Sequence, residues 1–164
     1  MHIKQSFAPI VNDQTRVLIL GSLPGDASLK QQQYYAHPQN RFWHLLSLII
    51  DTNLVDMSYS ERLQTLLENH IGLWDVVAQA NRRGSLDSQI RERSDNDLLG
   101  LIKSLPELRT IALNGATANK IGRQILSQQH SDFQIIDLPS SSPAYTLAFA
   151  LKAEMWLALR HCLS

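Results

Sequence analysis

Short apolar runs alternate along the chain with stretches in which apolar residues recur every three or four positions. The unbroken apolar runs predict buried β-strands, at residues 17–20, 110–113 and 133–136. Residues 71–77 are ambiguous but could form another short strand. The recurring pattern predicts helices over residues 40–50, 60–70, 97–105, 116–128 and 145–161, with Ser60 as a possible cap of the second. The polar, arginine-rich segment 81–95 is predicted to lack regular structure.

Strands that alternate with helices are typical of α/β proteins whose parallel sheet is covered by helices on both faces. The 164 residues suit one compact domain, so we expect a single domain over residues 1–164. In such folds a ligand binds at the carboxyl ends of the strands. Three unusual segments follow predicted strands, namely residues 21–43, 114–115 and 138–143. We therefore expect them to converge on one site.

The composition is that of an ordinary globular protein, with 44% apolar and 18% charged residues. The lone Cys162 excludes an intrachain disulfide and fits a reducing cytoplasm. No apolar run approaches the roughly 20 residues that span a bilayer, and the first residues lack the apolar stretch of a signal peptide. We therefore expect a cytoplasmic protein with no membrane partner.

A formal net charge of zero removes the simplest argument for a nucleic-acid partner. The charges are nevertheless unevenly spread along the chain. Residues 51–75 carry five acids and one arginine, whereas residues 1–50 and 76–93 each carry two more basic than acidic residues. Ordinary solvated surfaces would explain this pattern too. Because the basic segments include predicted site loops, neutrality does not exclude DNA.

The segment Gly21-Ser22-Leu23-Pro24-Gly25 directly follows the first predicted strand. Its glycines and proline favour a tight turn that lets the backbone approach a ligand closely. It lacks the G-x-G-x-x-G pattern and the Gly-Lys-Ser/Thr of a phosphate-binding loop. Taken alone, it could equally be a structural turn.

Residues 33–43 place four aromatic residues, several amides and possible cations just beyond that turn. Aromatic faces stack on nucleobases, which is worth about 1–3 kcal/mol per base. Tyr35 precedes the predicted helix and is a candidate wall of a base pocket, whereas Phe42 could belong either to that pocket or to the helix core. His37 could donate to a phosphate or be a buried structural histidine.

These two segments resemble the uracil-DNA glycosylase superfamily, and most closely its hypoxanthine-DNA glycosylase branch. The resemblance continues through residues 73–76, 84–88, 112–115 and 138–143. It implies a three-layer α/β/α sandwich around a four-stranded, mainly parallel sheet. It also implies hydrolysis of the N-glycosidic bond of a deaminated base, preferentially hypoxanthine, in base excision repair. The partner would be DNA with a flipped-out base, bound by a monomer without metal or cofactor.

The resemblance also assigns catalytic residues. Most superfamily members carry a catalytic Asp or Asn in the first turn, where this chain has Ser22-Leu23-Pro24. In the hypoxanthine branch the working amide lies in a His-Pro-x-Asn stretch, which implies Asn40 here, and a second amide is Asn114. Asn40 would hold the attacking water and Asn114 would bind the base. Asn40 could also cap the helix that follows, and the two roles are compatible.

The expected base pocket consists of Gly21, Ser22, Leu23, Pro24, Gly25, Tyr35, His37 and Phe42. The expected contacts to the DNA backbone are Ser140, Ser141, Ser142, Pro143, Arg82 and Arg83. Ser142 could also cap a helix that begins at Pro143. The six histidines show no zinc-binding spacing, so no metal site is expected.

Two other functions remain open from the sequence. A uracil or G:U mismatch-specific DNA glycosylase would share the same fold, although the superfamily's second-motif histidine is replaced here by residues 138–142. A nucleic-acid- or nucleotide-binding module without catalysis would explain the missing first-turn amide and the neutral charge. A panel of damaged bases would separate these alternatives.

Overall fold

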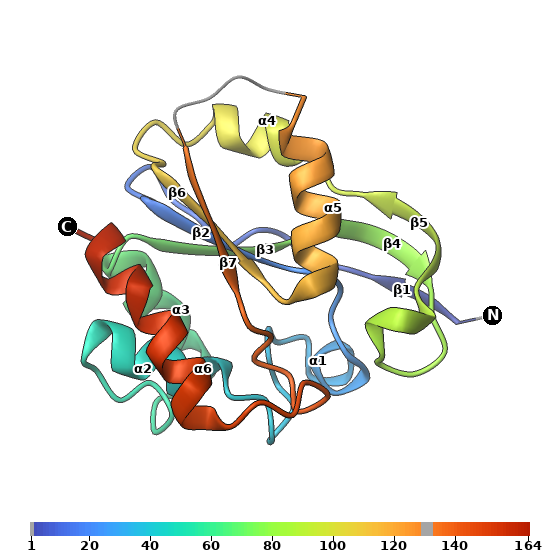
Figure 1. Ribbon diagram of the computed structural model, residues 1–164, viewed down its shortest axis with the longest axis horizontal. Coiled ribbons are helices and arrows are strands. Elements are labelled where there is room, and N and C mark those ends of the chain that lie inside the picture. The colour runs from blue at the N-terminus through green and yellow to red at the C-terminus, as the bar shows by residue number, and fades with distance from the viewer. Residues whose placement is uncertain (1, 129–132) are drawn as a thin grey trace.

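The computed structural model describes residues 2–128 and 133–164. At its centre lies a four-stranded sheet in the order β3-β2-β6-β7, in which every neighbouring pair is parallel. Its strands are β2 (Val17–Gly21), β3 (Ile71–Asp75), β6 (Thr110–Asn114) and β7 (Gln134–Leu138). β2, β6 and β7 overlap the apolar runs that predicted them, and β3 lies in the segment 71–77 that the sequence left ambiguous. The carboxyl ends of all four strands lie at the same edge of the sheet (Figure 1).

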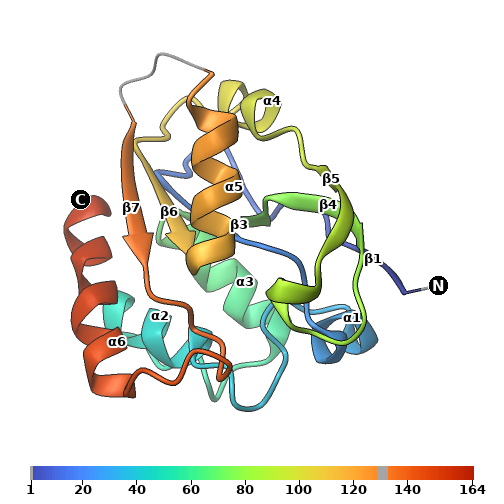
Figure 2. The ribbon, with the colours of Figure 1, turned by 45° about the vertical axis from the view of Figure 1, so that its right-hand side comes forward.

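Helices cover both faces of this sheet (Figure 2). On one face lie α2 (Phe42–Ile50), α3 (Tyr59–Glu68) and α6 (Phe149–Trp156), and on the other α4 (Leu98–Lys103) and α5 (Ala116–Leu126). The central strand β2 is buried throughout, with Val17 and Ile19 in one core and Leu18 and Leu20 in the other. The expected three-layer α/β/α sandwich is therefore confirmed.

The prediction that segment 81–95 lacks regular structure is wrong. A second sheet, antiparallel and in the order β1-β4-β5, lies beside the first. Its strands are β1 (Ile3–Gln5), β4 (Val77–Asn81) and β5 (Arg91–Asp95), with the 3₁₀ turn Asp87–Gln89 before β5. All five residues of β5 are exposed, so this strand has no apolar face that a sequence pattern could reveal.

Two helix ends also differ from the prediction. Ser58, not Ser60, caps α3: its hydroxyl accepts from the Glu61 N–H at 3.2 Å, and the Glu61 carboxylate accepts from the Ser58 N–H. The closing helix begins at Phe149 rather than at residue 145, and ends in a 3₁₀ segment, Leu157–Cys162. A short helix, α1 (Asp26–Gln31), follows the first turn. None of the described helices is long and apolar enough to cross a membrane.

Candidate active site

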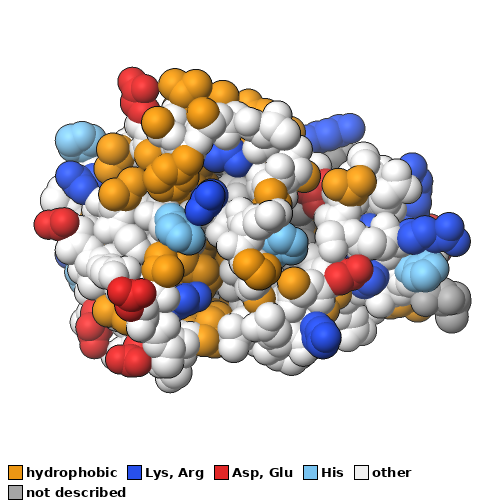
Figure 3. All heavy atoms as spheres, turned by 90° about the horizontal axis from the view of Figure 1, so that it is seen from below, with side chains coloured by type: hydrophobic (Ala, Val, Ile, Leu, Met, Phe, Trp, Pro, Cys, Tyr) orange, Lys and Arg blue, Asp and Glu red, His pale blue; other side chains and the backbone are white. Residues whose placement is uncertain are grey.

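A cavity of about 900 Å³ opens at the carboxyl ends of the four parallel strands. This edge is where α/β folds bind ligands. Figure 3 views the molecule from this side. The cavity is lined by the segments that follow each strand, by the loop before α2 and by the β4–β5 connection. These comprise residues 21–28, Tyr34, Tyr35, His37, Asn40, Asp75, 85–88, 114–117, Asn119, 137–145 and Met155.

The first turn can approach its neighbours closely because it begins with glycine. A Cβ atom on Gly21 would lie 2.7 Å from the Asp75 Oδ1 atom and 2.9 Å from the Tyr35 hydroxyl oxygen. Any other residue would therefore push Asp75 and Tyr35 apart. All five residues from Gly21 to Gly25 line the cavity, as expected for the base pocket.

Arg82 holds this turn in place from within the protein. Its side chain donates to the backbone carbonyl of Pro24, to that of Leu23 at 3.5 Å and to that of Gly84 at 2.8 Å. Only 1% of Arg82 is exposed, and this burial lowers the pKa of its guanidinium. The expectation that Arg82 contacts DNA phosphates is therefore wrong. The sequence around Arg82 does not indicate its burial, because its partners Leu23 and Pro24 follow a strand of the other sheet.

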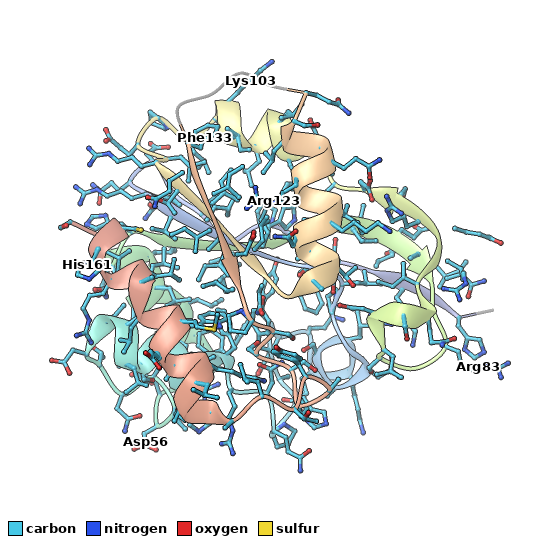
Figure 4. All side chains as sticks on the ribbon, viewed as in Figure 1. Asp56, Arg83, Lys103, Arg123, Phe133 and His161 are labelled. Carbon is cyan, nitrogen blue, oxygen red and sulfur yellow. The ribbon has the colours of Figure 1, made fainter. Side chains whose placement is uncertain are left out.

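Arg83 is exposed and is not among the residues that line the cavity. Figure 4 shows it at the outer end of the molecule, beside the β1-β4-β5 sheet and pointing away from the body of the protein. A contact between Arg83 and DNA would therefore fall outside the cavity, and this part of the sequence-based assignment stays a prediction.

Tyr35 forms one wall of the cavity, and Phe42 supports it from behind. The two rings are stacked, with centroids 3.8 Å apart and planes 11° from parallel. Phe42 is fully buried and contacts the edges of Trp43 and Trp156. The expectation that Phe42 lines the base pocket is therefore wrong, because it belongs to the core that holds Tyr35. Burial, together with Asp75, raises the pKa of the Tyr35 phenol, so the hydroxyl keeps its proton.

Asn114 ends β6 and ties three parts of the cavity wall together. Its Nδ2 atom donates to the Ser141 hydroxyl at 3.0 Å and to the Tyr35 hydroxyl at 3.3 Å. Its Oδ1 atom accepts from the Ser141 N–H at 3.0 Å. The amide therefore already uses both hydrogens, and only an oxygen lone pair remains for a ligand.

Ser141 is turned inward by these contacts and only 1% of it is exposed. Its expected contact with a DNA phosphate is therefore wrong for the side chain. Ser140, Ser142 and Pro143 line the cavity beside it. Ser140 packs against Gly115, whose φ of +96° and missing side chain allow this approach, since a Cβ atom would lie 3.1 Å from the Ser140 Cβ.

Asn40 lines the cavity and also stabilises the start of α2. Its Oδ1 atom accepts from the Phe42 N–H at 3.0 Å. The prediction that Asn40 is the N-cap is wrong by one position, because Arg41 is the N-cap and Asn40 bonds to the helix from the residue before it. His37 lines the cavity as well, and its Nδ1 atom accepts from the Gln39 N–H at 3.1 Å. The bond to Phe42 occupies one of the four hydrogen-bonding positions of the Asn40 amide, which can therefore bind a second group.

Two carboxylates in the cavity wall were missed by the sequence analysis. Asp75 is the last residue of β3 and is 4% exposed; burial, with a smaller contribution from Asp87, raises its pKa to about 7. Asp87 accepts from the Ser22 hydroxyl at 2.7 Å; burial raises its pKa, and the bonds from Ser22 and Thr117 oppose this effect. The position of Asp75 at the end of an apolar strand is a sequence signal that could have identified it as a site residue. Nothing near Asp87 in the sequence indicated its contact with Ser22.

This arrangement of a parallel sheet with an amide-rich cavity at its carboxyl edge is that of a known class of DNA-repair proteins. The model of the uracil DNA glycosylase superfamily matches residues 8–160, and the chain belongs to that superfamily. The predicted resemblance is confirmed.

Relatives with a more specific description are similar over most of the chain. A hypoxanthine DNA glycosylase from Methanosarcina acetivorans is 44% identical over 160 residues, covering 97% of this chain and 99% of that protein. One from Methanosarcina barkeri is 44% identical over 112 residues, covering 68% and 71%. The solution NMR structure of a uracil DNA glycosylase candidate from Methanosarcina acetivorans superposes with a TM-score of 0.86 at 40% identity, covering 98% of each chain.

Proposed function

We propose that this protein is a monofunctional DNA glycosylase that removes hypoxanthine from deoxyinosine in DNA as the first step of base excision repair. The observation that carries this proposal is the convergence of Asn40, Tyr35 and Asn114 on one cavity. The chain's similarity to proteins named hypoxanthine DNA glycosylase supports the choice of base.

The size of the cavity supports a single extruded nucleotide as the ligand. Its volume, about 900 Å³, lies within the usual range of small-molecule sites, roughly 300–1,000 Å³. Enzymes that act on a base within a duplex rotate it out of the stack, at a cost of a few kcal/mol that is smaller at a mismatch. Deoxyinosine opposite thymine is such a mismatch, so the lesion itself would favour extrusion.

The reaction replaces the C1′–N9 bond of the nucleotide by a bond between C1′ and the oxygen of water. The electron pair of the broken bond leaves with the base, the sugar acquires oxocarbenium character, and one water proton ends on the base. Asn40 would hold the water through its amide oxygen. Because an amide is a weak base, positioning must supply most of the rate enhancement.

The remaining cavity groups would stabilise charges that develop during bond cleavage. The Tyr35 hydroxyl, held by Asn114, keeps its proton and can donate to the departing base. Asp87 accepts a hydrogen bond from the Ser22 hydroxyl. When ionised, its carboxylate would place negative charge near the cationic sugar. None of the residues that line the cavity is a lysine, which supports hydrolysis by water rather than through a covalent imine.

The rim of the cavity supports binding of a DNA duplex around the extruded nucleotide. Ser140, Ser142 and Pro143 offer backbone and hydroxyl groups for the flanking phosphates. Hydrophobic side chains gather on the same face over the α6 segment (Figure 3). The large ones that are exposed there are Tyr145, Phe149, Leu151 and Met155.

The direct test is a panel of duplexes that contain hypoxanthine, uracil or xanthine at one position, incubated with purified protein and then treated with alkali to cleave abasic sites. We expect strand breaks chiefly at hypoxanthine. Preferential cleavage at uracil would instead support the uracil or mismatch-specific alternative. Binding without base release at any lesion would support the non-catalytic module and contradict the proposal.

A further inference from the structure

Asp75 is a buried carboxyl group in the cavity wall that the proposed chemistry leaves unused. It is 4% exposed, and its Oδ2 atom has no hydrogen-bond partner among the described residues. A buried carboxyl group without a partner destabilises a folded protein, and native structures rarely contain one without a functional reason. The position of Asp75 at the carboxyl end of β3 brings it into the cavity wall.

Asp75 lies close to the first turn and to Tyr35 in the wall of the cavity. A Cβ atom on Gly21 would lie 2.7 Å from the Asp75 Oδ1 atom and 2.9 Å from the Tyr35 hydroxyl oxygen, so the glycine allows both groups to pack against the turn. Arg82 is the cation whose charge acts on Asp75. Its guanidinium, however, donates to backbone carbonyl groups of the first turn. The carboxyl group thus remains available for a substrate.

We propose that the Asp75 carboxyl group recognises a deaminated base by accepting a hydrogen bond from its ring N–H. Deamination of adenine to hypoxanthine converts N1 from an acceptor into an N–H donor, and deamination of cytosine to uracil does the same at N3. An ionised carboxylate can only accept hydrogen bonds, so it pairs with the deaminated base and repels the ring lone pair of the normal one. This inference rests on the proposed function, because it names the group that selects the base.

The discrimination should depend on pH. Burial, and to a smaller degree the negative charge of Asp87, raises the pKa of Asp75 to about 7, while Arg82 opposes this shift. The phenols of Tyr34 and Tyr35 are the other titratable groups that its charge affects, and both have raised pKa values. Below its pKa, a protonated Asp75 could donate to N1 of adenine. Selectivity for hypoxanthine over adenine is therefore expected to fall as the pH is lowered through this value.

The test compares the binding of non-cleavable 2′-fluoroarabino analogues of deoxyinosine and deoxyadenosine, each placed opposite an abasic-site analogue so that base pairing does not differ. For the wild-type protein we expect a preference for the inosine analogue of at least about tenfold at roughly pH 8.5. We expect this preference to fall several-fold at roughly pH 5.5.

Three variants connect the preference to Asp75. Asp75→Leu removes the acceptor while keeping the number and branching of the side-chain heavy atoms, so the preference should be lost at both pH values. Asp75→Asn replaces one acceptor oxygen by an N–H₂ donor and does not titrate, so the preference for the inosine analogue should be smaller than that of the wild-type protein at roughly pH 8.5 and should not change with pH. Asp13→Asn makes the same chemical change in an exposed turn and should behave as wild type.

Thermal unfolding separates recognition from a structural role. Asp75→Leu should unfold at a higher temperature than wild type, because it removes an unpartnered buried carboxyl group. Should that variant fail to fold, the pH profile of Asp75→Asn carries the test. A wild-type preference in Asp75→Leu, or a preference in Asp75→Asn that still falls as the pH is lowered, would overturn the inference. Absence of base release by the wild-type protein at every lesion would instead refute the proposed function.

Discussion

At the scale of single residues, Asn40 combines a structural and a proposed catalytic role. We expect Asn40→Ala to reduce hypoxanthine release by at least about a hundredfold through loss of the positioned water. We also expect a loss of about 1 kcal/mol of unfolding free energy, because the N–H of Phe42 loses its side-chain acceptor. Single-turnover kinetics and urea denaturation measure the two effects.

Asn40→Asp is the matched control, because its carboxylate can still accept from the Phe42 N–H and still bind a water. It should keep the stability and part of the activity. If Asn40→Ala were as active as the wild-type protein, the role of Asn40 would be limited to its hydrogen bond with the Phe42 N–H.

Asn114 is expected to affect both base preference and stability. Asn114→Ala removes the bonds to Ser141 and Tyr35 and leaves the buried N–H of Ser141 without an acceptor. We expect a loss of about 1–3 kcal/mol in the free energy of unfolding. Base release should slow and the ratio of hypoxanthine to uracil cleavage should change, which the lesion panel measures.

Asn53→Ala provides a comparison, since Asn53 is an amide outside the cavity that bonds to Asp56 near the protein surface. It should change neither the cleavage ratio nor the stability appreciably. An unchanged cleavage ratio in Asn114→Ala would remove Asn114 from the proposed site.

At the scale of elements, the first turn depends on a brace, which is the set of hydrogen bonds that Arg82 donates to the carbonyl groups of Leu23 and Pro24. Arg82→Met should cost about 2–4 kcal/mol of stability, because carbonyl groups of Leu23 and Pro24 lose a buried donor. Base release should fall with it, since the turn lines the cavity. The slope of DNA affinity against salt concentration should stay unchanged, because a buried arginine neutralises no phosphate. Fluorescence titrations at several salt concentrations test this, and a shallower slope would mean that Arg82 reaches DNA.

The elements that the sequence predicted share one property, which is burial of an apolar pattern. Strands β2 and β6 are buried along their whole length and were evident as apolar runs. β5 is exposed at every position and is held by backbone pairing with β4, so no periodicity marked it. Ser58 is different, because the Ser-x-x-Glu spacing from Ser58 to Glu61 is a local capping-box signature that the sequence does contain.

The candidate site was likewise predicted only in part. The motifs located the cavity, but they could not show which side chains face it. Arg82 and Ser141 are polar residues that turn inward to partners more than twenty positions away in the sequence. Asp87 reaches Ser22 across 65 positions. Such contacts follow from tertiary packing, which local sequence does not encode.

At the scale of the whole molecule, the buried Asp75 carboxyl group couples folding to pH. Its pKa of about 7 in the folded protein lies above the ordinary value of 3.8, so the folded state holds a proton that the unfolded state releases between these values. Its contribution to stability is therefore full below about pH 4 and is lost as the pH rises through about 7, at up to about 1.4 kcal/mol per pH unit.

The difference in unfolding free energy between wild type and Asp75→Asn isolates this contribution. Urea denaturation between about pH 4 and pH 8 should show the variant gaining relative to wild type as the pH rises. A constant difference across this range would show that Asp75 has an ordinary pKa in the folded protein.

The brace between Arg82 and the first turn also has a consequence for the order of folding. The two partners are 58 positions apart, and they follow strands of different sheets. The hydrogen bonds between them can therefore form only when the parallel sheet and the β1-β4-β5 sheet have come together. The ability to select and release a base would then be the last property to appear during refolding, and the first to be lost when the β1-β4-β5 sheet detaches.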